Sequence, residues 1–127
     1  MATAKTTRDL REDEVTFEVL CELDHISIKG NVLASGDDEE DQAAEDWVAQ
    51  QIESGNAWAW GIVTVRASWE GFTGRDTLGG CSYRSREEFM GLDGYYPDMR
   101  TAALADLNRN IRMADASLRQ LRCADED

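Results

Sequence analysis

The chain has 127 residues, 42% of them hydrophobic, and its 26 acidic residues outnumber 13 basic ones to give a formal net charge of −13. This length and apolar fraction are typical of a single domain with a buried core, and the charge argues against direct binding to nucleic acid or to an anionic membrane surface. No apolar run approaches the roughly 20 residues that span a bilayer, and the N-terminal segment lacks the apolar stretch of a signal peptide. We therefore expect a soluble, cytoplasmic protein.

The acidic excess lies almost entirely in the first half of the chain. Residues 1–55 carry 15 acidic and four basic residues, a net charge of −11, whereas residues 56–127 carry 11 acidic and nine basic residues, a net charge of −2. A surface of one sign attracts the opposite sign. This distribution permits binding to a basic partner through the first half.

The N-terminal segment is polar, which predicts that it packs little against the core. Residues 1–12 are expected to form a flexible arm, residues 13–123 a single domain and residues 124–127 an acidic tail. From Val15 to Leu23 apolar residues occupy every second position, a pattern typical of a half-buried antiparallel strand.

An acidic helix is predicted over about residues 37–54. Ser35 and Asp38 have capping-box spacing, and acidic residues cluster in the first turn, where the helix dipole favours them. At 100° per residue one side of this helix is apolar and the other is anionic. We expect the apolar side to pack on the sheet and the anionic side to face water.

A central hairpin is predicted over residues 58–82. The stretch from Trp58 to Phe72 is rich in tryptophan and β-branched residues, and Glu70-Gly71 has the form of a two-residue turn. We expect Trp58 and Trp60 to be covered by the last helix; the alternative is that they anchor a partner. The glycines of the second strand, Gly74 among them, often mark bulges or close approach of two backbones.

A short helix after Ser85 precedes a last helix over about residues 97–121. Apolar residues recur there at heptad spacing: Leu104, Leu107, Ile111, Ala114, Leu118 and Leu121. We expect Leu104 to Ile111 to lie on the sheet. The later part either does the same or projects and pairs with a second copy. The predicted class is α+β, a small antiparallel sheet of about three strands covered by the acidic helix and the long C-terminal helix.

No catalytic or metal-binding motif is recognisable, and we predict neither an enzyme nor a bound cofactor or metal. His25, the single histidine, adjoins Asp24, but neighbours on a strand point to opposite faces. Cys81 follows two glycines and is expected to be a packed thiol. The three cysteines are odd in number and widely spaced, which argues against a disulfide framework.

The acidic helix is the candidate binding surface. Duplex DNA carries roughly one charge per 1.7 Å of axis, and carboxylates held on a rigid helix present a comparable array. The predicted partner-binding residues are Asp37, Asp38, Asp41, Glu45, Asp46 and Glu53. The alternative is that this surface only keeps the protein soluble.

Four segments carry a resemblance: Trp69-Glu-Gly-Phe-Thr-Gly74, Leu78-Gly-Gly-Cys-Ser-Tyr83, Gly94-Tyr-Tyr-Pro-Asp-Met99 and Ala103-Leu-Ala-Asp-Leu-Asn108. They resemble small proteins of tailed phages and prophages, over about the latter half of the chain. Small acidic phage proteins include anti-restriction and anti-CRISPR inhibitors of host defence, several of which are DNA mimics. The resemblance implies this context and no catalytic residue.

Two functions follow as hypotheses. The first is a non-enzymatic phage or mobile-element inhibitor that occupies the basic nucleic-acid site of a host defence complex. The second is a homodimeric structural or accessory phage protein whose interface is formed by Ile111, Ala114, Leu118 and Leu121 of the last helix.

Overall fold

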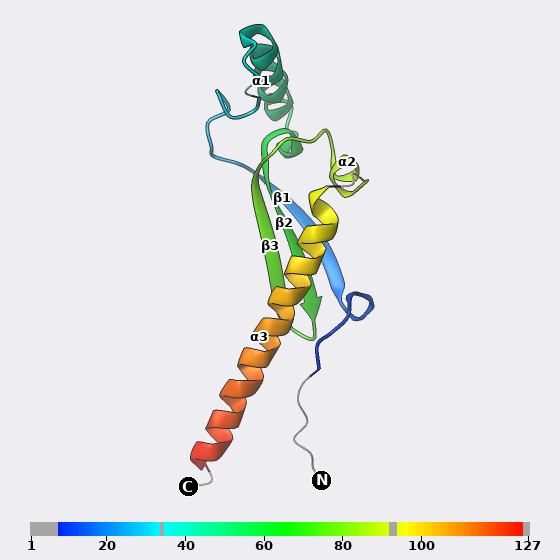
Figure 1. Ribbon diagram of the computed structural model, residues 1–127, viewed down its shortest axis with the longest axis vertical. Helices are drawn as coiled ribbons and strands as arrows, with labels where there is room; N and C mark the ends of the chain where they lie inside the picture. The colour runs from blue at the N-terminus through cyan, green and yellow to red at the C-terminus, as the bar shows by residue number, and fades with distance from the viewer. Residues whose placement is uncertain (1–7, 34, 92–93, 126–127) are drawn as a thin grey trace.

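The computed structural model describes residues 8–33, 35–91 and 94–125. In chain order the elements are η1 (Glu12–Glu14), β1 (Thr16–Leu23), α1 (Asp38–Glu53), η2 (Ala57–Trp60), β2 (Gly61–Trp69), β3 (Phe72–Cys81), α2 (Arg86–Gly91) and α3 (Tyr95–Asp125), as Figure 1 shows. The three strands form one antiparallel sheet in the order β1-β2-β3. The predicted α+β class with a three-stranded sheet is confirmed.

The hairpin turns where the sequence predicts. Trp69 pairs with Phe72, and the two residues between them have positive φ, 47° at Glu70 and 85° at Gly71. Two successive left-handed residues match the right-handed twist of the strands, which is why short hairpins favour this turn. The hairpin strands span residues 61–69 and 72–81, shorter than the predicted 58–82, because residues 57–60 form a 3₁₀ turn.

One face of the sheet is covered by α3, as predicted. Met99, Ala103 and Leu107 recur at four-residue spacing and are buried against the strands. The contact is closest at Gly74 of β3, where an added Cβ would lie 2.1 Å from the backbone nitrogen of Leu107 and 2.6 Å from the carbonyl oxygen of Ala103. The close backbone approach expected for the glycines of this strand therefore occurs at Gly74.

The acidic helix has the predicted length but a different position. α1 lies beyond the end of the strands and packs on η2, whereas the sequence predicted that it covers the sheet (Figure 1). Its apolar side is narrow: Val48 is fully buried, but Trp47 is 36% exposed. So narrow an apolar stripe packs on the single 3₁₀ turn of η2 and is too small to cover a sheet face.

Trp60 of η2 is buried, and Trp58 packs against the core cluster to which Met99, Ala103 and Leu107 of α3 belong. The indole nitrogen of Trp60 donates to the carbonyl oxygen of Ile26, 2.9 Å away in the loop after β1. The Trp58 ring lies 5.7 Å from that of Phe89 in α2. The loop after β1 and the short helix α2 therefore contribute to the cover of these two side chains.

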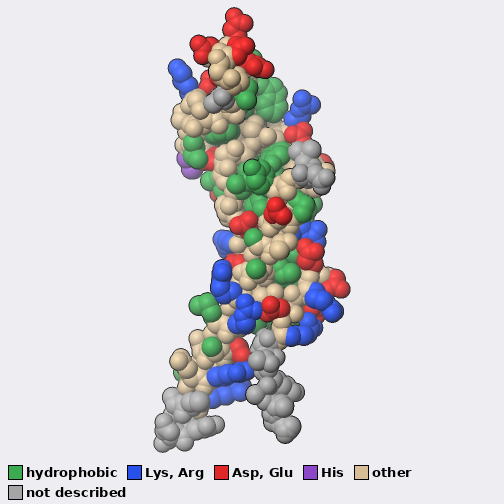
Figure 2. Space-filling model, viewed as in Figure 1, with side chains coloured by type: hydrophobic (Ala, Val, Ile, Leu, Met, Phe, Trp, Pro, Cys, Tyr) green, Lys and Arg blue, Asp and Glu red, His purple; other side chains and the backbone are tan. Residues whose placement is uncertain are grey.

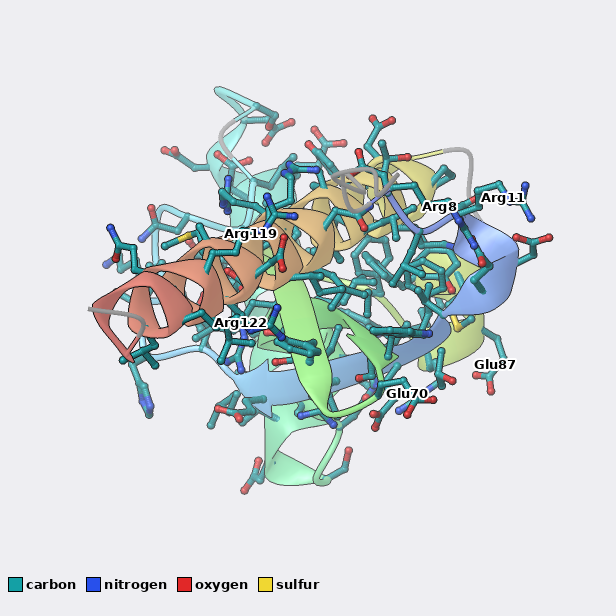
Figure 3. The ribbon with its side chains drawn as sticks, turned by 90° about the horizontal axis from the view of Figure 1, so that it is seen from below. Arg8, Arg11, Glu70, Glu87, Arg119 and Arg122 are labelled. Carbon is teal, nitrogen blue, oxygen red and sulfur yellow. The ribbon has the colours of Figure 1, made fainter. Side chains whose placement is uncertain are left out.

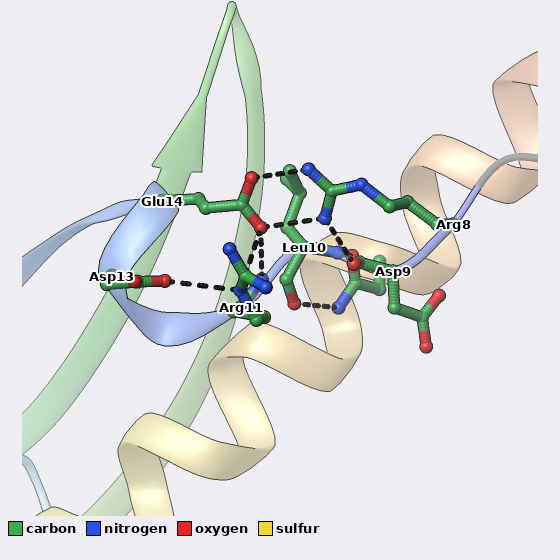
Figure 4. Close-up of polar contacts among 7 residues, drawn as sticks. Arg8, Asp9, Leu10, Arg11, Asp13 and Glu14 are labelled. Carbon is green, nitrogen blue, oxygen red and sulfur yellow. Dashed lines mark hydrogen bonds and ion pairs between the residues drawn. The ribbon is translucent and has the colours of Figure 1, made fainter.

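The arm predicted to be flexible through residue 12 is fixed from Arg8 onward. The buried side chain of Asn108 in α3 accepts from the backbone nitrogen of Leu10 at 2.8 Å and donates to its carbonyl oxygen at 3.2 Å. The Arg8 guanidinium makes a two-pronged ion pair with Glu14 at 2.6 and 2.8 Å (Figure 4). Further ion pairs join Asp9 to Arg112 and Glu12 to Arg100. This segment is thereby held along α3.

Candidate functional site

The acidic side chains of residues 37–53, which we call the acidic head, gather at one end of the molecule. The segment contains eight carboxylates, and no lysine or arginine occurs between residues 30 and 65. In Figure 2 red side chains crowd the tip formed by α1, whereas most blue side chains lie toward the opposite end, around α3. The molecule is therefore electrically polar along its long axis.

Three of the six predicted binding residues are used to build the head itself. The Asp37 carboxylate caps α1 by accepting from the backbone nitrogens of Glu39 and Glu40 at 3.0 and 3.3 Å. Such a cap satisfies donors that the first helical turn leaves without partners. The predicted capping residue was Ser35, two positions earlier, whose hydroxyl accepts instead from the Asp37 nitrogen at 3.2 Å.

Asp41 and Glu45 hold the loop that precedes α1. Asp41 accepts from the backbone nitrogen of Ser35 at 3.0 Å and from its hydroxyl at 2.8 Å, and Glu45 accepts from the backbone nitrogen of Gly30 at 2.8 Å. The bonds from Ser35, backbone first, lower the pKa of Asp41 because they favour its charged form. Both side chains are half-buried, so they contribute charge to the head but little reach.

The other three predicted residues, Asp38, Asp46 and Glu53, are exposed. Asp46 accepts from the Gln42 side chain at 2.8 Å. Two further carboxylates of the head, Glu39 and Glu40, are exposed but are not among the predicted binding residues. Glu39 shares the helical stripe of Asp46 and Glu53, so the helical period alone places it on the anionic side. The exposure of Glu40 depends on the position of α1 beyond the end of the strands.

None of the eight head carboxylates makes an ion pair with a basic side chain among the described residues. The ion pairs of the described chain lie in the N-terminal segment, in the sheet and along α3. Glu39, Asp46 and Glu53 are seven residues apart and form one stripe, with a spacing of about 10 Å along the helix. The negative field of the head is therefore not neutralised within the described molecule.

An open hollow of about 330 Å³ lies between α1 and the preceding loop. It is lined by Lys29, Gly30, Leu33, Asp38, Asp41, Gln42 and Glu45. Lys29 is its basic member, and Asp41 and Glu45 already accept bonds from the loop backbone. Among the described residues no group of three or more His, Cys, Asp or Glu side chains is placed to hold a metal ion.

The residues considered for chemistry have structural surroundings. The buried Asp24 carboxylate accepts from the backbone nitrogens of Gly80 at 2.6 Å and Ile26 at 3.0 Å, which lowers its pKa, while His25 is exposed. Burial raises the pKa of the Cys81 thiol and raises that of Cys21 to about 11, so both are protonated at neutral pH. The side chain of Cys123 lies outside the described residues.

Comparison of the chain with protein-family models, with curated proteins and with solved structures gives no match. In the part of the chain that the structure describes, no helix is both long and apolar enough to cross a membrane.

Proposed function

We propose that the acidic head binds a basic nucleic-acid site on a host protein and keeps nucleic acid out of it. The observation that supports this is the absence of basic partners for the head carboxylates among the described residues, although ion pairs are plentiful elsewhere. A surface that served only solubility would have no need to collect its charge at one projecting end. The resemblance to phage proteins suggests an inhibitor of a defence complex that acts in the host cytoplasm.

The charge density of the head is of the right order for a short piece of nucleic acid. α1 has 16 residues and is therefore about 24 Å long. One DNA strand carries a phosphate every 3.4 Å of axis, so about seven phosphates occupy this length. The eight carboxylates of residues 37–53 match one strand over that distance. The head is thus suited to a site that grips a single strand or one edge of a duplex.

The two kinds of head carboxylate have different parts in this proposal. Asp38, Asp46 and Glu53 are exposed, and in this proposal they pair with arginine or lysine side chains of a partner. Asp37, Asp41 and Glu45 fix the helix and its loop, which keeps the array rigid before binding. Exposed charges of this kind accelerate association, and salt weakens their effect.

Charge reversal on the exposed stripe tests the proposal. The double variant Asp46→Lys, Glu53→Lys changes two exposed side chains and removes the bond that Asp46 accepts from the Gln42 side chain. The matched control, Glu70→Lys, Glu87→Lys, makes the same change in net charge at two exposed sites away from α1, where both side chains point outward (Figure 3). We expect the control to bind like the wild type and the head variant to lose at least about tenfold in affinity, since close charge pairs across an interface are worth 1.5 kcal/mol or more.

The assay has two steps. Partners are captured from host lysate at low and at high salt, and each purified partner is then tested for binding to DNA or RNA with and without the protein. The proposal requires competition with nucleic acid that the head variant lacks. Equal competition by the head variant and the control, or a partner that binds nucleic acid undisturbed, would contradict it.

A further inference from the structure

The C-terminal part of α3 projects from the molecule as a single helix. α3 has 31 residues, a length of about 46 Å, and it continues well past the end of the sheet (Figure 1). We call residues 112–125 the stem. Its larger apolar side chains face water: Met113 is 63% exposed, Leu118 56% and Leu121 63%. The predicted alternative in which the later part of this helix projects is the one that the structure shows.

The exposed apolar side chains of the stem give it a surface that packing would stabilise. The packed first part of α3 nucleates the stem, but most helical stability in proteins comes from packing of an apolar face. Leu118 and Leu121 continue the stripe that Ile111 begins against the core. The stem therefore has the pattern of a packed helix but no cover from the described residues.

The two flanks of this stripe differ in charge. With seven residues in two turns, Ala114, Leu118 and Leu121 fall on the a and d positions of a heptad. Asp115 and Arg122 follow the d positions and lie on one flank, and the small Ser117 lies on the other. One edge of the stripe thus carries an acid and a base one heptad apart, and the other edge is uncharged.

This arrangement is complementary to itself in one orientation. In a parallel pair each charged flank faces the uncharged flank of the partner, so no opposite charges meet. In an antiparallel pair charged flank faces charged flank. With Leu118 beside the partner's Leu121, Asp115 lies about 3 Å along the axis from the level of the partner's Arg122. The twofold axis then generates the same pair again.

We propose that the stem pairs with the stem of a second copy in antiparallel orientation, with Leu118 and Leu121 in the seam and Asp115 opposite the partner's Arg122. Asp115 also contacts Arg119 of its own helix at 3.1 Å, and a carboxylate has room for more than one donor. The Arg122 side chain is exposed at the end of α3, as Figure 3 shows.

The interface is small, and the dimer is an equilibrium. With Leu118 level with the partner's Leu121, two stems overlap over about 12 residues, or about 18 Å. The area that so short a contact buries lies at or below the lower end for specific interfaces, about 1,200 Å². The acidic heads lie at the opposite end of the molecule from the stems (Figure 1). An antiparallel dimer therefore carries one head at each outer end and is able to bind two sites at once. The pairing does not rest on the proposed function of the head.

A matched pair of variants tests whether the stripe is the interface. Leu121 and Met113 are equally exposed, but only Leu121 lies in the seam. Light scattering and sedimentation over a wide concentration range should show a monomer–dimer equilibrium for the wild type and for Met113→Asp. For Leu121→Asp the dissociation constant should rise at least about tenfold. A monomeric wild type, or equal effects of the two substitutions, would overturn the proposal.

Cysteine cross-linking tests the orientation. In a Cys123→Ser background, Leu118→Cys and Leu121→Cys proteins are oxidised separately and as a mixture. Antiparallel pairing predicts that the mixture cross-links faster than either protein alone, because position 118 faces position 121 of the partner. Faster cross-linking of each protein with itself would show parallel pairing and refute the proposal. Leu121→Asp should not change how much partner each acidic head binds. The pairing of the stems and the proposed function of the head can therefore be refuted independently.

Discussion

At the residue scale, Gly74 sets how closely α3 packs on the sheet. Any Cβ at this position would overlap the α3 backbone at Ala103 and Leu107 rather than the end of a movable side chain. Relief therefore requires the whole helix to shift, and with it the buried Met99. Added side-chain volume costs most where two backbones are in contact, because protein interiors are already packed to crystal density and a backbone cannot move aside as a side chain can.

The variant Gly74→Ala should therefore destabilise the protein by about 3 kcal/mol, at the upper end of typical overpacking effects. The matched control is Gly91→Ala, at the end of α2, where an added Cβ meets nothing within 4 Å. We expect that control to unfold at the wild-type urea concentration or slightly above it. Urea unfolding followed by tryptophan fluorescence measures both. A loss below about 1 kcal/mol for Gly74→Ala would mean that α3 moves away without cost.

Asn108 shows what the sequence could not reveal at this scale. It sits in the polar part of the heptad pattern, and nothing around it distinguishes it from a solvent-facing residue. Its two bonds to Leu10 join residues 98 positions apart. Local periodicity predicts which side of an element is apolar, but it carries no information about a polar residue whose partner comes from a distant segment.

At the element scale, the strands and helices themselves were largely predictable. Apolar alternation located β1, Glu70-Gly71 located the hairpin, and clustered acids with a capping signal located α1. The position of α1 was not predictable, because its apolar stripe fits any apolar surface. Which head carboxylates turn inward was hidden for a related reason: it depends on where the loop places the backbone nitrogens of Gly30 and Ser35.

The N-terminal segment gives a pH prediction at this scale. The ion pair and hydrogen bonds with Arg8, followed by a bond from the backbone nitrogen of Arg11, lower the pKa of Glu14 from 4.5 to about 2. Because the pKa in the folded state is the lower one, the ionised Glu14 contributes its full stabilisation above pH 4.5. That contribution is lost progressively as the pH falls toward 2.

We expect residues 8–14 to detach from α3 between pH 4.5 and 2, before the sheet unfolds. Amide hydrogen exchange of Leu10, whose nitrogen donates to Asn108, reports the release. In Glu14→Gln the amide should exchange faster already at neutral pH and should lose part of this acid dependence, because the ion pairs of Asp9 and Glu12 with α3 remain. Wild-type protection that stays constant down to pH 2 would contradict the assignment of Glu14 as a group that fixes the conformation of residues 8–14.

At the scale of the whole molecule, the two ends are governed by opposite electrostatics. The head gathers eight carboxylates and has no described basic partner, so its charges repel one another. Ion pairs of Arg100 with Glu12 and of Arg112 with Asp9 join α3 to the N-terminal segment, and Arg8 pairs with Glu14 within that segment. Salt screens both interactions, and the Debye length falls from about 30 Å at 0.01 M to about 8 Å at 0.15 M.

Added salt should therefore stabilise one end and loosen the other. Between about 0.01 and 0.15 M salt the screening length drops below the spacing of about 10 Å along the head stripe, so repulsion within α1 weakens and its amides should exchange more slowly. Over the same range amides of residues 8–14 should exchange faster, because their ion pairs are screened. Hydrogen exchange followed by mass spectrometry resolves the two segments in one experiment.

In Asp46→Lys, Glu53→Lys the slowing at α1 should disappear while the change at residues 8–14 persists. Changes of the same sign at both ends would mean that salt acts on global stability, and that the head charges do not form a locally repulsive array.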